Sequence, residues 1–370
     1  MKRYFFALAA FISVVCSAEA QTTTSTTPNC HPSDKEATEA TVELYNNLFK
    51  WDDKGVMLGH QDDLAYGIGW LDSGDYKSDV QMVTGDYPAL FGWDLGHLEL
   101  GEECNLDGVP FEDMRRNIIW VDRNGGVNTF SWHLRNPLTL GDSWDISSKK
   151  VVWSILNDAS TRRCYYEFLE KLAEFMLSLK RENGELIPVI FRPLHELSGR
   201  WFWWGRDLCT VDEYVTLWRD TIDFLRAKGV HNMLVSYSMA GYKSVEQFTE
   251  RYPGDDYVDI VGFDIYHYGT AKEYIEDMHI RSDIARAFAL ERGMIWAVCE
   301  TGYETIPDKD WFTTVLLPGI EGKQCSHLLL WRNAQNRPNH FYASYPGHKS
   351  ARDMKRFAKR DDVLTMSELR

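Results

Sequence analysis

Eight short apolar runs alternate with longer amphipathic stretches between Val56 and the C-terminus of this chain. The runs lack strict polar alternation, which is typical of parallel strands that are covered on both faces. Eight such strands with helical returns predict an α/β fold, a (β/α)8 barrel. The runs lie at residues 56–60, 89–94, 127–133, 186–193, 232–238, 259–266, 294–300 and 327–333.

Two of the intervening stretches have a clear helical pattern. Thr210 and Glu213 have the spacing of a capping box, and Gly229 is expected to end the helix that they start. Residues 164–184 show a similar apolar stripe. The inward faces are predicted to consist of Tyr214, Leu217, Trp218, Thr221, Ile222 and Leu225 in the first helix, and of Phe168, Leu172, Phe175 and Leu179 in the second.

The main alternative fold is an open, doubly wound sheet. Such sheets bind dinucleotides through a G-x-G-x-x-G motif after an early strand, and this chain has none there. The 370 residues are long enough for two domains, but α/β barrels often exceed 250 residues as one domain. We therefore expect one barrel domain over residues 35–370.

The N-terminus is predicted to be a signal peptide, residues 1–20. Residues 1–3 supply positive charge, residues 4–15 are mostly apolar, and Ala18-Glu19-Ala20 forms a cleavage site of the A-x-A type. The apolar segment is shorter than the ~20 residues that span a membrane. We expect export, to the periplasm rather than the medium, because no cell-wall or carbohydrate-binding module is attached.

The exported chain would begin with a short tether. Residues 21–34 are predicted to be flexible, since the stretch QTTTSTTP offers nothing apolar to bury. Lipid attachment through Cys16 is disfavoured because bulky Val15 precedes it where a small residue is expected. In an oxidising compartment six cysteines are available, and sequence leaves their pairing open. They are Cys30, Cys104, Cys164, Cys209, Cys299 and Cys325.

Charge and composition narrow the range of partners. The formal net charge of -15 would repel nucleic acid and anionic lipid, so neither is an expected partner. No CxxC or HExxH spacing occurs, so the sequence predicts no zinc site and no cofactor. The 14 Trp, 18 Tyr and 18 Phe are many for a chain of this size, and those outside the core are available for stacking on flat apolar faces. We expect an acidic monomer.

Residues with reactive side chains follow the expected strands. Active sites of (β/α)8 barrels lie at the C-terminal ends of the strands, so these residues should gather at one face. Glu196 follows the fourth strand and Glu300 ends the seventh, so the two carboxyls are predicted to face each other. The other candidates are Trp132 and His133 on the third strand, Arg192 and His195 on the fourth, Asp264, Tyr266 and His267 on the sixth, and Trp331 and Arg332 on the eighth.

Two facing carboxyls beside aromatic rings are what glycoside hydrolysis requires. One carboxyl must donate a proton to the leaving oxygen, while the other must be charged to attack or to stabilise an oxocarbenium-like centre. Arg192 near Glu300 would favour the charged form of Glu300, and the apolar Trp cluster of residues 201–204 would favour the neutral form of Glu196. Each residue alone fits a structural role, as rim residue, packing or ion pair. Their coincidence at one barrel face favours the catalytic interpretation.

The segment RPLHELSGRWFWWG, residues 192–205, resembles the strand-four signature of family 26 glycoside hydrolases. That family has His before the acid/base glutamate where most of its clan has Asn, and this chain reads His195-Glu196. Further resemblances are SWHLRNP, GFDIYHY, CETGYE and LLLWRNA, which cover nearly the whole mature sequence in the family's order. Most members are β-mannanases of the retaining (β/α)8 clan.

The resemblance implies roles for individual residues. Glu196 would be the acid/base and Glu300 the nucleophile, and Tyr266 would hold the nucleophile in place. Trp331 would lie beneath the sugar that is cleaved, and Trp201 would form a wall at the cleavage point. The remaining implied residues are His133 and His195 near the sugar hydroxyls, Arg332 one subsite further toward the non-reducing end, and Arg192 and Asp264 as supporting groups. Residues 138–152 form an insertion without matched positions.

The resemblance implies retaining hydrolysis of β-1,4-mannosidic linkages in mannan, glucomannan or galactomannan. These neutral polysaccharides suit a chain without a basic patch. Activity on β-1,3-xylan or mixed-linkage β-glucan is an alternative within the same family, and the motifs do not separate the substrates. A barrel that binds polysaccharide without cutting it is an alternative of another class, which the presence of both carboxylates disfavours. Internal and chain-end cleavage both remain open.

Overall fold

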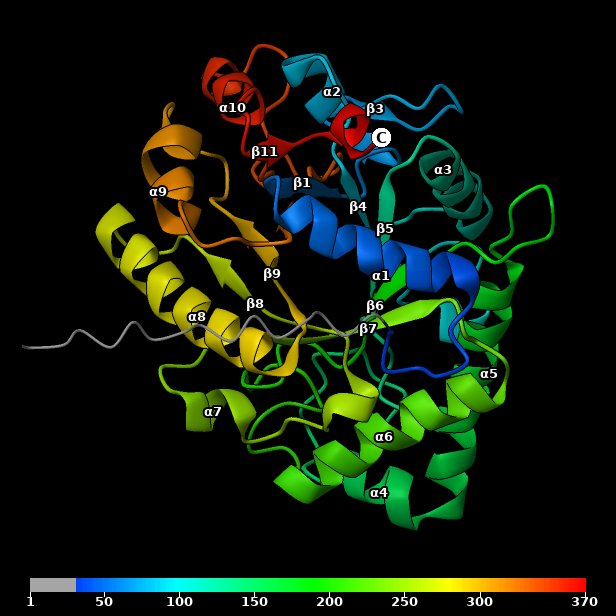
Figure 1. Cartoon of the computed structure of the whole chain (residues 1–370). Helices are drawn as coiled ribbons and strands as arrows, with labels where there is room; N and C mark the ends of the chain where they lie inside the picture. The colour runs from blue at the N-terminus through cyan, green and yellow to red at the C-terminus, as the bar shows by residue number, and fades with distance from the viewer. Residues whose placement is uncertain (1–30) are drawn as a thin grey trace, which may run out of the picture.

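The computed structural model describes residues 31–370, and its central feature is a closed ring of eight parallel strands (Figure 1). The ring strands are β1 Val56–Gln61, β4 Leu90–Asp94, β5 Val127–Ser131, β6 Val189–Arg192, β7 Met233–Met239, β8 Ile260–Tyr266, β9 Ile295–Gly302 and β10 His327–Leu330. Each pairs with the next, and β10 pairs back onto β1 in parallel, from Met57 with His327 to His60 with Leu330. This closure confirms the predicted (β/α)8 barrel, and the open doubly wound sheet was wrong.

Helices surround the ring (Figure 1). They are α1 Glu39–Asp52, α2 Asp79–Thr84, α3 Phe111–Arg123, α4 Val151–Asn157, α5 Ala159–Ser178, α6 Val211–Ala227, α7 Val245–Thr249, α8 Ala271–Arg292, α9 Leu317–Ile320 and α10 Ala351–Ala358. Three short strands lie outside the ring, β2 Tyr66–Gly67 paired with β3 Trp70–Leu71, and β11 Val363–Leu364 paired with the start of β1. The sequence did not predict these, because two residues are too few to show a period.

Local sequence explains where the two predicted helices begin and end. The capping box of α6 is present, since the Glu213 amide donates to Thr210 Oγ1 at 3.2 Å and the Thr210 amide donates to Glu213 Oε2 at 2.8 Å. All six residues of the α6 stripe are buried. The second helix, α5, begins at Ala159 rather than at residue 164, because Asp158 caps it by accepting from the Thr161 amide at 2.8 Å. It ends at Ser178 rather than at residue 184, because the chain then turns back and Lys180 pairs with Leu186.

Helix α1 closes the N-terminal end of the barrel. Leu44, Leu48 and Trp51 of α1 belong to the same buried cluster as residues inside the ring. The chain just before α1 is also part of the fold, because the Ser33 amide donates to Asp259 Oδ1 at 2.5 Å and Asp34 is buried. The ordered chain therefore includes residues that the sequence placed in the tether. The predicted signal peptide, Cys16 and Cys30 lie outside the described residues.

The barrel interior is apolar toward the N-terminal ends of the strands and polar toward their C-terminal ends. Ile190, Leu234, Ile260, Ile295 and Leu329 form an apolar cluster inside the ring. Along each strand successive side chains point to opposite faces, so residues two and four positions after an inward-facing residue also face inward, nearer the C-terminal end of the barrel. These positions carry Asp94, Ser131, Arg192, Ser238 and Asp264, which are all buried. The C-terminal ends of the strands therefore present a buried polar layer.

The structure shows whether the described cysteines form disulfides and whether a described helix could cross a membrane. The five described cysteines are all free, so none of them pairs with another within residues 31–370. Over the same residues no helix has both the length and the apolar character needed to cross a bilayer.

Candidate active site

The turn after β6 carries His195 and Glu196 on an unusual backbone. Leu194 and Glu196 have φ of 45° and 54°, the left-handed region that residues other than glycine rarely adopt. The turn is held by neighbours, because Tyr214 Oη donates to the Leu194 carbonyl at 2.9 Å and Trp204 Nε1 donates to the His195 carbonyl at 2.9 Å. Strained turns of this kind occur where the surrounding structure holds a functional side chain in place.

A bulge in β9 turns Glu300 into the barrel. Phe263 of β8 pairs with Val298, but the next residue, Asp264, pairs with Glu300, so β9 contains one extra residue. Cys299 already points into the interior cluster, and strict alternation would send Glu300 outward. With the bulge Glu300 also faces inward, beside Asp264. The following residue, Thr301, faces out and bonds Tyr274 of α8 at 2.6 Å.

Arg192, Asp264 and Glu300 form a buried ion cluster. Arg192 Nη1 donates to Asp264 Oδ2 at 3.0 Å, and Arg192 Nη2 donates to Glu300 Oε1. Tyr266 Oη donates to the other oxygen of Glu300, Oε2, at 2.7 Å. Burial by itself would lower the pKa of Arg192, but the charges of Asp264 and Glu300 raise it, so the guanidinium stays charged. Both oxygens of Glu300 are thereby fixed in direction.

Glu196 lies in a different environment from Glu300. Burial and the charge of Glu300 raise the pKa of Glu196 to about 7. Trp201 Nε1 donates to Glu196 Oε2 at 2.6 Å, which favours the charged form and opposes this rise. The sequence-based hypothesis that the Trp cluster keeps Glu196 neutral was therefore incomplete, because the Trp that contacts the carboxyl acts in the opposite direction. Burial and Glu300 outweigh it.

His133 and His195 meet edge to face, with ring centroids 4.7 Å apart. His133 Nδ1 lies 2.5 Å from Asp94 Oδ2. Burial opposes charge on both partners, yet their pairing lowers the pKa of Asp94 to about 2 and raises the pKa of His133. His195 Nε2 lies 4.0 Å from Glu300 Oε1, and burial, Arg192 and His133 together lower the pKa of His195 far below its usual value. The surroundings therefore favour the charged form of His133 and the neutral form of His195.

The aromatic cluster of residues 201–204 divides into surface and core. Trp201 is 43 % exposed, whereas Phe202, Trp203 and Trp204 are buried. A Cβ at residue 199 would lie 2.5 Å from the Trp201 indole, so Gly199 allows this ring to fold back over the turn. Trp331 is half-buried at the end of β10, with its ring centroid 6.5 Å from that of His133. Solvent therefore reaches both Trp201, the predicted wall, and Trp331, the predicted platform.

Arg332 joins a separate polar network. Arg332 Nη2 lies 2.8 Å from Asp107 Oδ1, and Arg332 Nη1 donates to Tyr66 Oη at 3.2 Å. Tyr66 in turn donates to Asp62 Oδ2 at 2.6 Å. Burial raises the pKa of Asp62 to about 8, helped by the charge of Asp107. The contacts with Asp107 and Tyr66 therefore fix the position of the Arg332 guanidinium.

Two strand-end residues noted in the sequence do not join the site. His267 Nδ1 accepts from Trp311 Nε1 at 3.0 Å, and its ring stacks on Tyr274 of α8. Trp132 is buried and donates to Glu99 Oε2 at 3.1 Å. Both follow an inward-facing residue, so strand alternation turns them toward the helices.

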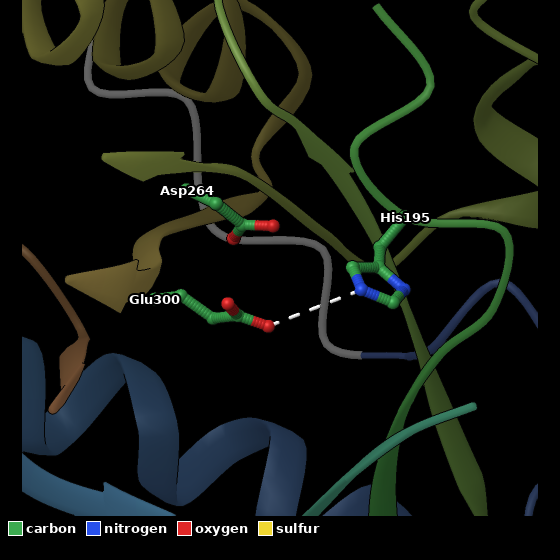
Figure 2. Close-up of side chains that lie close together, drawn as sticks. All are labelled: His195, Asp264 and Glu300. Carbon is green, nitrogen blue, oxygen red and sulfur yellow. Dashed lines mark ion pairs between the residues drawn. The ribbon is translucent and has the colours of Figure 1, made fainter. Parts of the chain in front are cut away.

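His195, Asp264 and Glu300 also have a spacing that a metal ion could use, since their donor atoms lie within 4.8 Å of one another (Figure 2). Arg192, however, already binds both carboxylates. A bound cation would have to displace or face this buried positive charge. The arrangement therefore suits an organic substrate better than a metal ion.

Sequence reasoning missed several residues of the site. Asp94 is the last residue of the second predicted strand, and this position could have identified it as a residue of the barrel mouth. Tyr66 and Asp107 lie in loops, where no period or motif marks them. Tyr268 and Trp144 are exposed aromatic residues near the mouth, and Trp144 stacks on His133 with ring centroids 5.1 Å apart.

The sequence matches one protein family and resembles several known mannanases. The family model described as Glycosyl hydrolase family 26 matches residues 33–301. Mannan endo-1,4-β-mannosidases of Bifidobacterium adolescentis and Caldalkalibacillus mannanilyticus are 31 % and 28 % identical over 91 % and 71 % of this chain. This chain spans only 35 % and 50 % of the length of those two proteins.

Solved structures agree with the sequence relatives. A family 26 β-mannanase from Bacteroides ovatus superposes with a TM-score of 0.88 and 44 % identity, covering 90 % of this chain and 97 % of that one. A modular endo-β-1,4-mannanase from Cellulomonas fimi superposes with a TM-score of 0.82 and 29 % identity, covering 91 % of this chain and 78 % of that one. The chain therefore belongs to glycoside hydrolase family 26.

Proposed function

We propose that this protein hydrolyses β-1,4-mannosidic linkages of mannan, glucomannan or galactomannan with retention of configuration. The observation that carries the proposal is the pair of carboxyls in contrasting environments. Glu300 is ion-paired with Arg192 and bonded by Tyr266, while Glu196 has a pKa raised to about 7. Two carboxyls made different by their surroundings are what glycoside hydrolysis requires. Retention, with Glu300 as nucleophile, is supported by the resemblance of RPLHELSGRWFWWG and CETGYE to a family of the retaining clan.

The proposed reaction uses these groups in two steps. Glu300 attacks the anomeric carbon while the Glu196 carboxyl gives its proton to the leaving oxygen, and a glycosyl ester on Glu300 forms. Glu196, now a carboxylate, then takes a proton from the water that cleaves this ester. Tyr266 keeps Glu300 aligned, and Trp331, His133 and His195 would surround the sugar. Arg332 would contact the unit beyond it.

The assignment of Glu196 predicts a pH effect and a leaving-group effect. The wild-type rate on polysaccharide should fall as pH rises through about 7, because Glu196 loses the proton that it must donate. Glu196→Ala should lack this limb and should lose roughly 10²–10⁴-fold on polysaccharide. It should keep appreciable activity on dinitrophenyl glycosides, whose leaving groups need little protonation. Steady-state rates on both substrates between pH 5 and pH 9 test this. Equal losses on both substrates would contradict the role.

Substrate choice is tested by comparing linear β-1,4-mannan, β-1,3-xylan and mixed-linkage β-glucan at equal mass concentration. The relatives named mannan endo-1,4-β-mannosidase support mannan. We expect manno-oligosaccharides from mannan and much slower release from the other two. Faster cleavage of xylan or glucan would overturn the mannan assignment, and binding without cleavage of any would favour a non-catalytic barrel. Chromatography of early products separates internal from chain-end cleavage.

We also propose that the protein is exported as a monomer to the periplasm after cleavage behind Ala20. Support comes from the charged, apolar and A-x-A pattern of residues 1–20 and from the acidic net charge. Mass spectrometry of the protein from the periplasmic fraction should give a chain that begins at Gln21. A full-length cytoplasmic chain would refute export, and a dimer by native mass would refute the monomer.

A further inference from the structure

A cavity of about 420 Å³ opens directly beside Glu196. Trp201, Tyr266 and Tyr268 line it together with the N-terminal half of α8. The lining includes neither Glu300 nor Trp331 nor Arg332. The cavity therefore contacts the proposed proton donor and borders the nucleophile through Tyr266, but the residues proposed to surround the sugar under attack, Trp331, His133 and His195, do not line it.

The proposed reaction indicates which part of the substrate this cavity would hold. In the proposed reaction Glu196 gives its proton to the oxygen that links the two parts of the substrate, and this oxygen leaves with the departing chain. The departing part must therefore lie against Glu196. The sugar that becomes bound to Glu300 lies on the opposite side, with Trp331 and His133. The cavity is accordingly placed to hold the departing sugar.

Tyr268 is the most exposed aromatic residue of the cavity wall, at 86 % exposure. Its backbone is well fixed, because its amide donates to the Tyr266 carbonyl at 3.1 Å and the preceding His267 amide donates to the Gly302 carbonyl at 2.9 Å. The side chain contributes little to the core, since its ring contact is with Tyr266 at 5.9 Å. An exposed tyrosine ring on a fixed backbone is suited to stacking on a sugar face, because only two side-chain torsions have to be ordered.

The polar wall of the cavity suits a neutral ligand. Asp277 of α8 is paired with both Lys243 and Arg281, and Glu273 caps α8 by accepting from the Thr270 amide at 2.8 Å. These charges are already balanced within the protein, so the wall offers hydrogen-bonding atoms without an unpaired charge. Sugar hydroxyls match this surface, whereas a charged ligand would find no free counter-charge.

We propose that Tyr268, which lines the cavity together with Trp201, forms a stacking wall of a subsite for the departing sugar, and that it determines how strongly the enzyme depends on a sugar there. This inference rests on the proposed function and adds a specificity residue to it. Tyr268 would act by binding, and it takes no part in proton transfer.

Four proteins test the proposal, namely wild type, Tyr268→Ala, Tyr268→Phe and Trp153→Ala. Trp153 is a matched control, because it is 49 % exposed on α4 and does not line the cavity. Each is assayed on mannopentaose, which has sugars on the departing side, and on dinitrophenyl β-mannobioside, which has none. Thermal melting checks that all four are folded.

We expect Tyr268→Ala to lower kcat/KM on mannopentaose by about tenfold and on the aryl mannobioside by less than about twofold, as the loss of one stacking contact implies. Tyr268→Phe should restore the mannopentaose value, and Trp153→Ala should match wild type on both substrates. Transfer of the mannobiosyl group to added mannotriose should also weaken in Tyr268→Ala, since the acceptor occupies the same subsite.

The outcomes separate this proposal from the proposed function. An equal loss on both substrates, or an unchanged rate on mannopentaose, would overturn the role of Tyr268 while wild-type cleavage of mannan upholds the function. If the wild type prefers another β-glycan, the same comparison is made with its oligosaccharides and aryl glycosides, because stacking requires only a sugar face. The mannan assignment then fails, and the contrast between substrates still decides the role of Tyr268.

Discussion

Glu300→Ala should lower turnover by about 10⁴-fold or more on every substrate, whatever its leaving group. The variant lacks the group that attacks the anomeric carbon, and a better leaving group does not replace a missing nucleophile. Small anions such as azide can enter the space left by the carboxylate, so we expect added azide to restore turnover of a dinitrophenyl glycoside and to give the α-azide product. Rates are measured by release of the chromophore, and the product anomer by NMR.

The matched control is Glu182→Ala, which removes an exposed glutamate from a surface loop, 88 % exposed. We expect its activity to equal that of wild type on all substrates. Comparable loss in both variants would show a general effect on folding. Glu300→Ala that keeps more than about a hundredth of wild-type turnover would contradict the nucleophile assignment.

Arg192→Met should cause the largest loss of stability, about 3–5 kcal/mol in the free energy of unfolding, because two buried acidic side chains lose the cation that they share. Burial already raises the pKa of Asp264 and Arg192 opposes this rise, so without the guanidinium Asp264 would hold its proton to still higher pH in the folded variant, whereas in the unfolded chain it ionises near pH 4. The variant therefore loses stability as pH rises above about 4, and its deficit relative to wild type should grow as pH rises through the folded-state pKa that Asp264 has in the wild type. Urea unfolding at several pH values measures this.

Two further variants serve as controls for the loss of stability in Arg192→Met. Arg192→Lys keeps the charge but not the paired N–H groups, so its loss should be smaller. Arg123→Met removes an exposed arginine, 74 % exposed and 3.4 Å from Glu182, and should change stability by less than about 1 kcal/mol. A deficit of Arg192→Met that is small, or that shrinks as pH rises, would refute the ion cluster as a stabilising unit at neutral pH.

The barrel was predictable because its strands are covered on both faces and stand out as apolar runs. The capping box at Thr210 and the glycine at residue 229 marked one helix closely, since capping chemistry is local. The start of α5 was misplaced because the Asp158 cap lies before the apolar stripe. The two-residue strands show no period, so only the folded chain reveals them.

The candidate site was predictable in its carboxyls but not in its geometry. Strand ends identified Glu196 and Glu300, yet the inward direction of Glu300 depends on a bulge at Cys299 that strict alternation would not predict. In the segment WFWW no period distinguishes exposed Trp201 from buried neighbours, because the segment is a turn. Partners such as Asp107 and Tyr66 reach Arg332 from distant loops. Tyr268 became visible only through its exposure beside the cavity.

The most direct test of the account is to trap the glycosyl ester on the enzyme. A 2-deoxy-2-fluoro-mannosyl fluoride slows both steps but forms the ester faster than water removes it, so the labelled protein can be digested and its peptides sequenced by mass spectrometry. The account predicts one label per molecule, on Glu300 in the segment CETGYE. A label on another residue, or no label on a protein that cuts mannan with inversion of the anomeric centre, would contradict it.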